Sequence, residues 1–199
     1  MTRRVLLVHG LWMHAPALYF WARALRAAGY RTEYFSYRSL LQGPEHACAR
    51  LRAAALAEPD TDIVAHSLGG LIALEALAGA GDFGGRIVCV GSPLAGSRIV
   101  RHYRDTLLGA LAGHSTALLS RGFMQVPDGL EVSVIAGTDP KGLGRIVHRF
   151  DEPNDGSVAV SETRIPGLRR HLCVPVSHSG QLFSKSVTRH ILALLERGI

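Results

Sequence analysis

The chain has 199 residues, 47% of them hydrophobic, and a formal net charge of +6. This size and composition are typical of one domain with a sizeable core, so residues 1–199 are expected to fold as a single unit. No apolar run approaches the roughly 20 residues that a membrane-spanning helix needs. The first apolar run, Val5–Val8, is also shorter than the apolar region of a signal peptide, which predicts a cytoplasmic protein.

The positive charge comes mostly from arginine, and Arg98, Arg101 and Arg104 recur at helical spacing. A solvated basic face is the simplest interpretation, and a weak contact with an anionic membrane surface is the functional one. No nucleic-acid partner is expected, because no recognition motif or basic–aromatic platform accompanies the charge. The oligomeric state does not follow from the sequence.

The three cysteines, Cys48, Cys89 and Cys173, lack any CxxC spacing. Their odd number and their spacing predict free thiols in a reducing compartment rather than a disulfide framework. Each lies among apolar neighbours, so all three are expected to be buried.

Short apolar runs alternate with helical patterns along the chain. The sequence predicts a strand at 4–10, a helix at 18–28, a strand at 30–37, a helix at 44–57, a strand at 61–66 and a helix at 68–78. Further strands follow at 86–93, 130–137 and 171–176, and a last helix at 184–197. This alternation indicates an α/β fold, with a mostly parallel sheet covered by helices on both faces.

The span 97–129 breaks the alternation, because it separates two strands by a longer, leucine-rich stretch. It is either an ordinary crossover helix with an extra turn or a small helical cap over the site. In open parallel sheets, sites form at the carboxyl ends of the strands. The polar residues of this chain collect at those ends.

Ser67 stands between the apolar run DIVAH and a glycine pair. A tight strand-to-helix turn pushes its central side chain above the sheet and needs small residues two positions before and after it. Ala65 and Gly69 meet this demand. Serine also caps helices, but a cap needs no small residue on each side. The pattern therefore favours Ser67 as a nucleophile over a helix cap.

A serine nucleophile needs a base, and the base needs an acid to orient it. His178 follows the last strand at its carboxyl end and is the predicted base, whereas His171 precedes that strand and His190 lies inside the last helix. Two acids remain open on the residues alone. Asp139 comes just after a strand, and Asp155 lies in an Asn-Asp-Gly turn.

Four segments occur in an order that resembles the small bacterial lipases and esterases of the α/β-hydrolase superfamily: VLLVHGLW, VAHSLGGL, NDGSV and VSHSGQLF. The resemblance covers most of the chain from residue 4 onward and implies the α/β-hydrolase fold. Some of these relatives carry alanine at the position of Ala65. Their triad acid lies in an N-D-G-x-V turn, which implies Asp155 here and leaves Asp139 as the alternative.

A developing oxyanion needs two preorganised N–H donors. The residue after the nucleophile, Leu68, supplies one, and the resemblance implies Leu11, which follows His9-Gly10, as the other. His9 and His66 are interpreted as packed structural histidines rather than as bases. An apolar acyl site is expected from four further side chains: Trp12, Met13, Phe123 and Met124.

These residues predict a serine hydrolase of carboxylic esters that acts on a small-molecule ester or lipid through an acyl-enzyme. An acyltransferase or an amide or thioester hydrolase on the same triad is the alternative, as is a binding protein of the same fold without turnover. No metal or cofactor is expected, because His9, His14 and His66 lack metal-site spacing and no phosphate-binding glycine loop is present.

Overall fold

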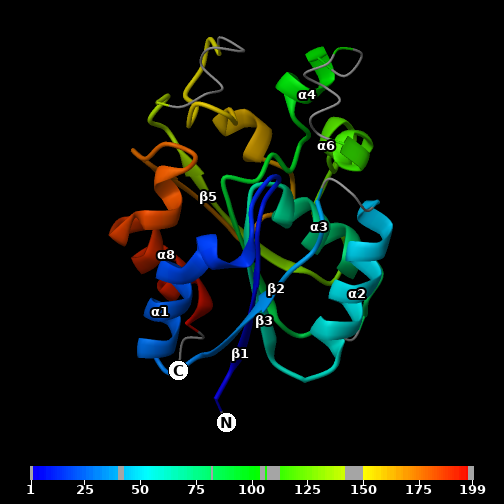
Figure 1. Cartoon of the computed structure of the whole chain (residues 1–199), viewed down its shortest axis with the longest axis vertical. Coiled ribbons are helices and arrows are strands. Elements are labelled where there is room, and N and C mark those ends of the chain that lie inside the picture. Colours follow the sequence, from blue (N-terminus) through cyan, green and yellow to red (C-terminus); the bar gives the residue numbers. More distant parts are fainter. Residues whose placement is uncertain are drawn as a thin grey trace.

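The computed structural model describes residues 2–39, 43–81, 83–103, 106, 113–141 and 150–196. Its centre is a six-stranded sheet in the order β2-β1-β3-β4-β5-β6, and every neighbouring pair is parallel (Figure 1). The strands are β1 Arg4–Val8, β2 Arg31–Phe35, β3 Thr61–His66, β4 Arg86–Val90, β5 Glu131–Gly137 and β6 Arg170–Val174. The sequence-based prediction of a parallel α/β fold is confirmed.

Helices cover both faces of the sheet. The α-helices are α1 Tyr19–Ala27, α2 Pro44–Leu56, α3 Leu68–Leu77, α4 Arg98–Tyr103, α6 Thr116–Arg121 and α8 Lys185–Leu195. Short 3-10 helices are η1 Ala15–Leu18, η2 Gly113–Ser115, η3 Val160–Thr163 and η4 Gly180–Phe183. In Figure 1, α1 and α8 lie on one side of the sheet, and α2 and α3 lie on the other.

Strand alternation divides the core into two layers. In β1, Val5 and Leu7 pack with α1 and α8, whereas Leu6 and Val8 pack with α2 and α3. This follows from the two-residue period of a strand, which sends successive side chains to opposite faces. The inner strands are buried on both faces, which explains why their sequences are continuously apolar rather than alternating.

The helices differ in how much of their surface is covered. Nine of the ten residues of α3 are buried, because this helix packs against β1, β3 and β4 as well as α2 and α6. By contrast, α8 buries one face through Val187, Ile191 and Leu195, at intervals of four residues. Its first turn is capped by the Ser184 hydroxyl, which accepts a hydrogen bond from the Val187 amide.

The edge strand β6 corrects one sequence-based prediction. Cys48 and Cys89 are buried free thiols, but Cys173 is exposed. The expectation of burial was wrong for Cys173 because β6, within the described part of the chain, has a neighbouring strand on one side only and leaves most of its side chains partly open. An apolar run alone does not distinguish an edge strand from a central one.

The described part of the span 97–129 forms α4, η2 and α6, and Figure 1 places α4 and α6 at the carboxyl end of the sheet. Leu118 and Leu119 of α6 are buried in the core layer of α3. Leu107, Leu108 and Leu111 of the predicted crossover or cap lie outside the described residues. Within the described part of the chain, no helix is long and apolar enough to cross a membrane.

Candidate active site

Ser67 occupies the turn between β3 and α3 in a backbone conformation that L-residues seldom adopt, with φ 54° and ψ −123°. Its side chain makes no capping hydrogen bond to the helix that it precedes. A Cβ atom added to Gly69 would lie 2.7 Å from the carbonyl oxygens of Val8 and His9, so strand and helix backbones approach closely here. Ala65 is fully buried in β3. The small residues therefore permit a strained turn that projects the Ser67 side chain above the sheet.

A line of hydrogen bonds connects Ser67 with two of the residues singled out in the sequence. The Ser67 Oγ lies 3.1 Å from Nε2 of His178, and Nδ1 of His178 lies 2.7 Å from Oδ2 of Asp155. Ser67 follows β3, His178 follows β6, and Asp155 lies in the segment between β5 and η3. The fold thus brings together three polar side chains from separate loops at the carboxyl edge of the sheet.

Both carboxylate oxygens of Asp155 accept hydrogen bonds. Its Oδ1 accepts backbone N–H bonds from Ser157 at 3.0 Å and Val158 at 2.8 Å. Burial opposes ionisation of this carboxyl group, but the adjacent His178 side chain and these hydrogen bonds outweigh burial and lower the pKa of Asp155. A negative charge on Asp155 is therefore favoured directly behind the imidazole.

The alternative acid, Asp139, has a different partner. Its carboxylate lies 3.2 Å from Nζ of Lys141, and its side chain is 28% exposed, against 1% for Asp155. The backbone amide of Asp139 bonds the carbonyl oxygen of Val176, which places the residue beside the strand end. Between the two acids, it is Asp155 that contacts the His178 imidazole.

Gln181 is a polar residue of this site that sequence reasoning did not single out. Its side chain is fully buried, and its Nε2 donates a 2.9 Å hydrogen bond to the same Asp155 oxygen that contacts His178. A Cβ atom at Gly91 or Gly137 would lie 2.4 Å from the Gln181 amide, so both glycines leave room for it. The Gln181 Oε1 is buried without a hydrogen-bond partner among the described residues. No local pattern separates this glutamine from an exposed one.

His9 orients the loop that follows β1. The Tyr37 amide donates to Nε2 of His9, so Nδ1 carries the proton and donates to the Gly10 carbonyl oxygen at 2.9 Å. The N–H of Leu11 is anti to that carbonyl in the planar trans peptide and points away from His9. His9 also stacks on Tyr37, with ring centroids 4.5 Å apart. Burial lowers the pKa of His9, in keeping with a neutral ring.

Leu68, the second expected donor, is the first residue of α3. N–H groups in the first turn of a helix have no partner within that helix, and they form the positive end of its dipole. Gly10 links the two donors, because a Cβ atom there would lie 2.9 Å from the Ser67 Cβ. The β1 loop and the start of α3 therefore meet beside Ser67.

His66 lies under the imidazole of His178, with ring centroids 4.8 Å apart. It is fully enclosed, and one of its ring nitrogens, Nε2, bonds the His178 carbonyl oxygen at 3.2 Å. Burial, followed by the nearby His178, lowers the pKa of His66 to about 3. A neutral His66 therefore supports the backbone of His178 from below.

Comparison with known proteins identifies the family of this chain. The model of a family described as "Alpha/beta hydrolase family" matches residues 5–183 of this chain. The chain belongs to the alpha/beta hydrolase family. No curated protein matches the sequence. The expected resemblance to lipases and esterases is confirmed at the level of this hydrolase family and its structural neighbours.

Several solved structures share the hydrolase fold. The mature form of Bacillus licheniformis lipase BlEst2 has a TM-score of 0.83 at 20% identity, covering 98% of this chain and 93% of that chain. Its propeptide form has a TM-score of 0.83 at 19% identity and covers 99% of this chain, which spans about half (51%) of that longer protein. A carboxylesterase structure from Nitrososphaera gargenis has a TM-score of 0.64 at 14% identity, covering 96% and 89% of the two chains. At these identities the likeness concerns the fold.

The four side chains expected to line an acyl site of this hydrolase differ in burial and in the core layer that they contact. Phe123 packs against the core layer of α3, as does Leu11, whereas Met13 packs against the layer of α1 and α8. Trp12 is 58% exposed and Met124 is 92% exposed. Phe123 and Met13 thus pack on opposite faces of the sheet, and Met124 is open to solvent.

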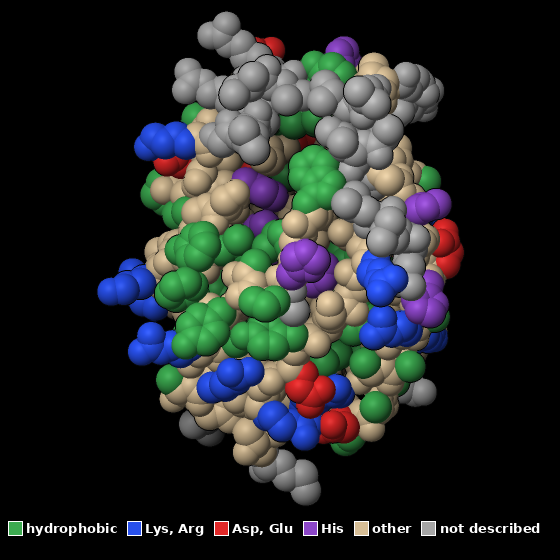
Figure 2. Space-filling model, viewed as in Figure 1, with side chains coloured by type: hydrophobic (Ala, Val, Ile, Leu, Met, Phe, Trp, Pro, Cys, Tyr) green, Lys and Arg blue, Asp and Glu red, His purple; other side chains and the backbone are tan. Residues whose placement is uncertain are grey.

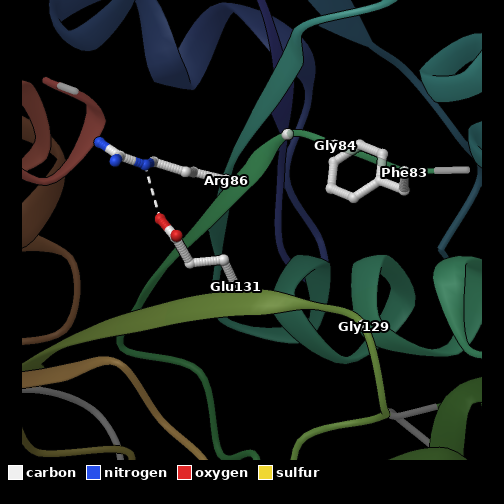
Figure 3. Close-up of a pocket in the computed structure, with 6 residues that line it drawn as sticks. Phe83, Gly84, Arg86, Gly129 and Glu131 are labelled. Carbon is white, nitrogen blue, oxygen red and sulfur yellow. Dashed lines mark ion pairs between the residues drawn. The ribbon is translucent and has the colours of Figure 1, made fainter. Parts of the chain in front are cut away.

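A separate hollow of about 280 Å³ lies at the opposite edge of the sheet, where β4 and β5 begin. Figure 3 shows its lining residues Phe83, Gly84, Arg86, Gly129 and Glu131. Arg86 and Glu131 pair across it, with Nε 2.5 Å from Oε1. The two charges thus satisfy each other at the end of the sheet opposite the candidate site. Among the residues that the structure describes, no group of three His, Cys, Asp or Glu side chains could hold a metal ion.

Proposed function

We propose that this alpha/beta hydrolase is a serine hydrolase that cleaves carboxylic esters through an acyl-enzyme on Ser67. The single observation that carries the proposal is the hydrogen-bonded line from the Ser67 Oγ through His178 to Asp155, built on a strained turn. Backbone strain at one non-glycine residue costs about 1–3 kcal/mol and is typical of functional sites. A helix cap would require neither the strain nor the two partners.

In the first half of the reaction, the Ser67 Oγ attacks the acyl carbon while its proton passes to Nε2 of His178. Asp155 accepts a hydrogen bond from Nδ1 and stabilises the imidazolium that forms. The carbonyl oxygen becomes an oxyanion, held by the N–H groups of Leu11 and Leu68. As the tetrahedral intermediate collapses, the ester C–O bond breaks and His178 gives its proton to the leaving alcohol.

In the second half, water replaces the alcohol. Nε2 of His178 takes a proton from that water as its oxygen attacks the acyl carbon, and the same N–H donors hold the second oxyanion. The bond between the acyl carbon and the Ser67 Oγ then breaks, and His178 returns the proton to the serine. The carboxylic acid leaves and the enzyme is restored.

Two observations favour esters. Solved structures of the same fold are described as a lipase and as carboxylesterases. Leu11, in the loop whose Gly10 closely approaches the Ser67 Cβ, is also partly buried and packs against the apolar core layer of α3. An apolar surrounding suits an acyl chain better than a charged peptide substrate.

The proposal is tested by labelling and turnover on the purified chain. A fluorophosphonate probe should label the wild type and not the Ser67→Ala variant. Ser67→Ala and His178→Ala should lower the turnover of a p-nitrophenyl ester by about 10⁴-fold or more. Ser36→Ala and His46→Ala, which change the same residue types at exposed positions, serve as matched controls. Normal turnover in Ser67→Ala would refute the mechanism.

A further inference from the structure

Large aromatic side chains are exposed together beside the carboxyl edge of the sheet. Tyr19 and Phe20 of α1 are 51% and 47% exposed, and Phe183 at the end of η4 is 60% exposed. The ring centroids are 5.8 Å apart for Tyr19–Phe20 and 5.3 Å apart for Phe20–Phe183. We call these three residues the aromatic patch. Trp12 is 58% exposed and lies in the loop that leads into η1, the short helix that ends just before Tyr19.

A buried hydrogen bond links the two elements that carry the aromatic patch. Trp21, fully buried under the patch in α1, donates from Nε1 to the Gln181 carbonyl oxygen in η4 at 3.3 Å. This bond joins the two elements that carry Tyr19, Phe20 and Phe183. Exposed aromatic rings that are held rigidly lose little conformational entropy when they insert elsewhere, which is the physical advantage of a preorganised contact surface.

Positive charge surrounds the aromatic patch without acidic residues from the same segments. Residues 1–32 and 163–195, which contain η1, α1, η4 and α8, include no Asp or Glu at all. Four basic residues of α1 and α8 are exposed: Arg23, Arg26, Lys185 and Arg189. None of them takes part in the ion pairs between described residues.

Figure 2 shows hydrophobic side chains gathered over α1 and the start of α8, with Lys and Arg side chains at the border. On this face, acidic side chains lie below the gathered hydrophobic groups, among Lys and Arg side chains, as well as nearer the edges. Histidine side chains are visible next to the gathered hydrophobic groups. This side of the molecule therefore combines apolar and positive surface.

Several arginines elsewhere are engaged within the fold. The Arg3 guanidinium binds both carboxylate oxygens of Asp62, and Arg98 pairs with Glu152. Arg101, which was expected to belong to a solvated basic face, donates to the carbonyl oxygens of Ala95 and Ser120. Arg98 and Arg101 are thus held by partners within the fold, whereas Arg23, Arg26, Lys185 and Arg189 of α1 and α8 are exposed. Arg104 lies outside the described residues.

We infer that the aromatic patch and its basic border dock the protein onto an anionic lipid surface. Tyrosine and tryptophan favour the boundary between water and acyl chains, and phenylalanine inserts below it. Basic side chains beside such groups are attracted by anionic headgroups. A C2 dimer through the same patch would bring Arg23, Arg26, Lys185 and Arg189 of both copies together without compensating acids from these segments.

Docking in this orientation places the site next to the lipid. Phe183 lies five residues after His178, and Trp12 directly follows Leu11. A lipid ester that leaves the membrane surface would then reach Ser67 over a short path through water. This use of the docking surface rests on the proposed function, whereas docking itself does not.

Vesicle binding tests the inference directly. Vesicles of phosphatidylcholine with phosphatidylglycerol should bind the wild type, and vesicles of phosphatidylcholine alone should bind it more weakly. Trp12 is the reporter, because the chain has two tryptophans and Trp21 is fully buried. Its emission should shift to shorter wavelength on binding, and salt should reverse the shift.

Two sets of variants separate the apolar and charged contributions. Phe20→Ser with Phe183→Ser should weaken partitioning by at least about tenfold, because both rings lose their insertion. Arg23→Gln with Arg189→Gln should weaken it by roughly fivefold per residue. The matched controls are Leu56→Ser on α2, and Arg50→Gln with Arg121→Gln on α2 and α6, on the opposite face of the sheet.

The outcomes distinguish this inference from the proposed function. Equal binding of the wild type and Phe20→Ser/Phe183→Ser to anionic vesicles, or no binding at all, would overturn docking and leave ester hydrolysis unaffected. A dimer in solution that these two substitutions abolish would assign the patch to a second copy and would also overturn it. Vesicle binding without ester turnover would support docking and refute the proposed function. The Phe variants should keep wild-type turnover of a water-soluble acetate ester.

Discussion

Replacing Gln181 by methionine should reduce activity while leaving stability almost unchanged. The substitution keeps the side-chain volume and removes the amide that donates to Asp155 Oδ2 at 2.9 Å. It also removes the Gln181 Oε1, which is buried without a partner among the described residues. The two changes act on the free energy of unfolding in opposite directions.

The magnitudes follow from these two atoms. A hydrogen bond to a charged group contributes about 1.5–3 kcal/mol, and relieving a buried unsatisfied carbonyl returns about 1–3 kcal/mol. The free energy of unfolding should therefore change by about 1 kcal/mol or less. Asp155 meanwhile loses the neighbour that fixes the oxygen facing His178. We expect kcat to fall about tenfold, equivalent to about 1.4 kcal/mol in the activation barrier.

The assay is steady-state hydrolysis of a soluble p-nitrophenyl ester, together with urea unfolding of the same preparations. Because Gln181 lies behind Asp155 and away from the solvent-facing side of Ser67, KM should stay close to the wild-type value. Gln125→Met, at an exposed position, is the matched control. A kcat within twofold of the wild type would refute a positioning role, as would a loss of activity explained entirely by a smaller folded fraction.

Three further predictions concern the site and its support. Asp155→Asn should lower kcat by about 10⁴-fold, by analogy with the serine-protease triad, and Asp139→Asn should change it little; the reverse result in the same ester assay would assign the acid to Asp139. The pKa of His66 is about 3 in the folded state, against 6.5 in the unfolded state. The free energy of unfolding should therefore fall by about 1.4 kcal/mol per pH unit as the pH is lowered from 6.5 toward 3. His66→Gln should flatten that slope in urea titrations, and an unchanged slope would contradict the assignment. Gly69→Val should prevent folding or abolish turnover, since its Cβ would lie 2.7 Å from two carbonyl oxygens; circular dichroism and the ester assay together check this.

The sequence predicted the elements well because this fold depends on strong local signals. The predicted strand at 61–66 coincides with β3, and Pro44 begins α2 as expected. Glycine at position 29 follows α1 with a positive φ of 88°, which identifies the helix end. Periodicity and turn chemistry act over a few residues, so a single sequence contains them.

The candidate site was less accessible to the same reasoning. Asp139 follows an apolar run, and Asp155 lies in an Asn-Asp-Gly turn before one. Turn chemistry alone does not separate the two acids, whereas the resemblance implied Asp155, which is the one in contact with His178. Gln181 carried no signal because its burial results from Gly91 and Gly137, which are distant in the sequence. Phe20 and Phe183 contact each other across 163 residues, a pairing that no periodicity reveals.

The position of His178 after the edge strand β6 has a consequence for how the protein should lose activity on heating. Among the described strands, β6 pairs with β5 alone, and most of its side chains are partly open to solvent. It therefore belongs to the part of the sheet that can open locally at low free energy. Ser67, by contrast, follows the central strand β3. Loss of β6 would separate the imidazole from the hydroxyl while the remaining five strands stay paired. Inactivation should then precede global unfolding, and enzyme activity would report on the fraying of one sheet edge.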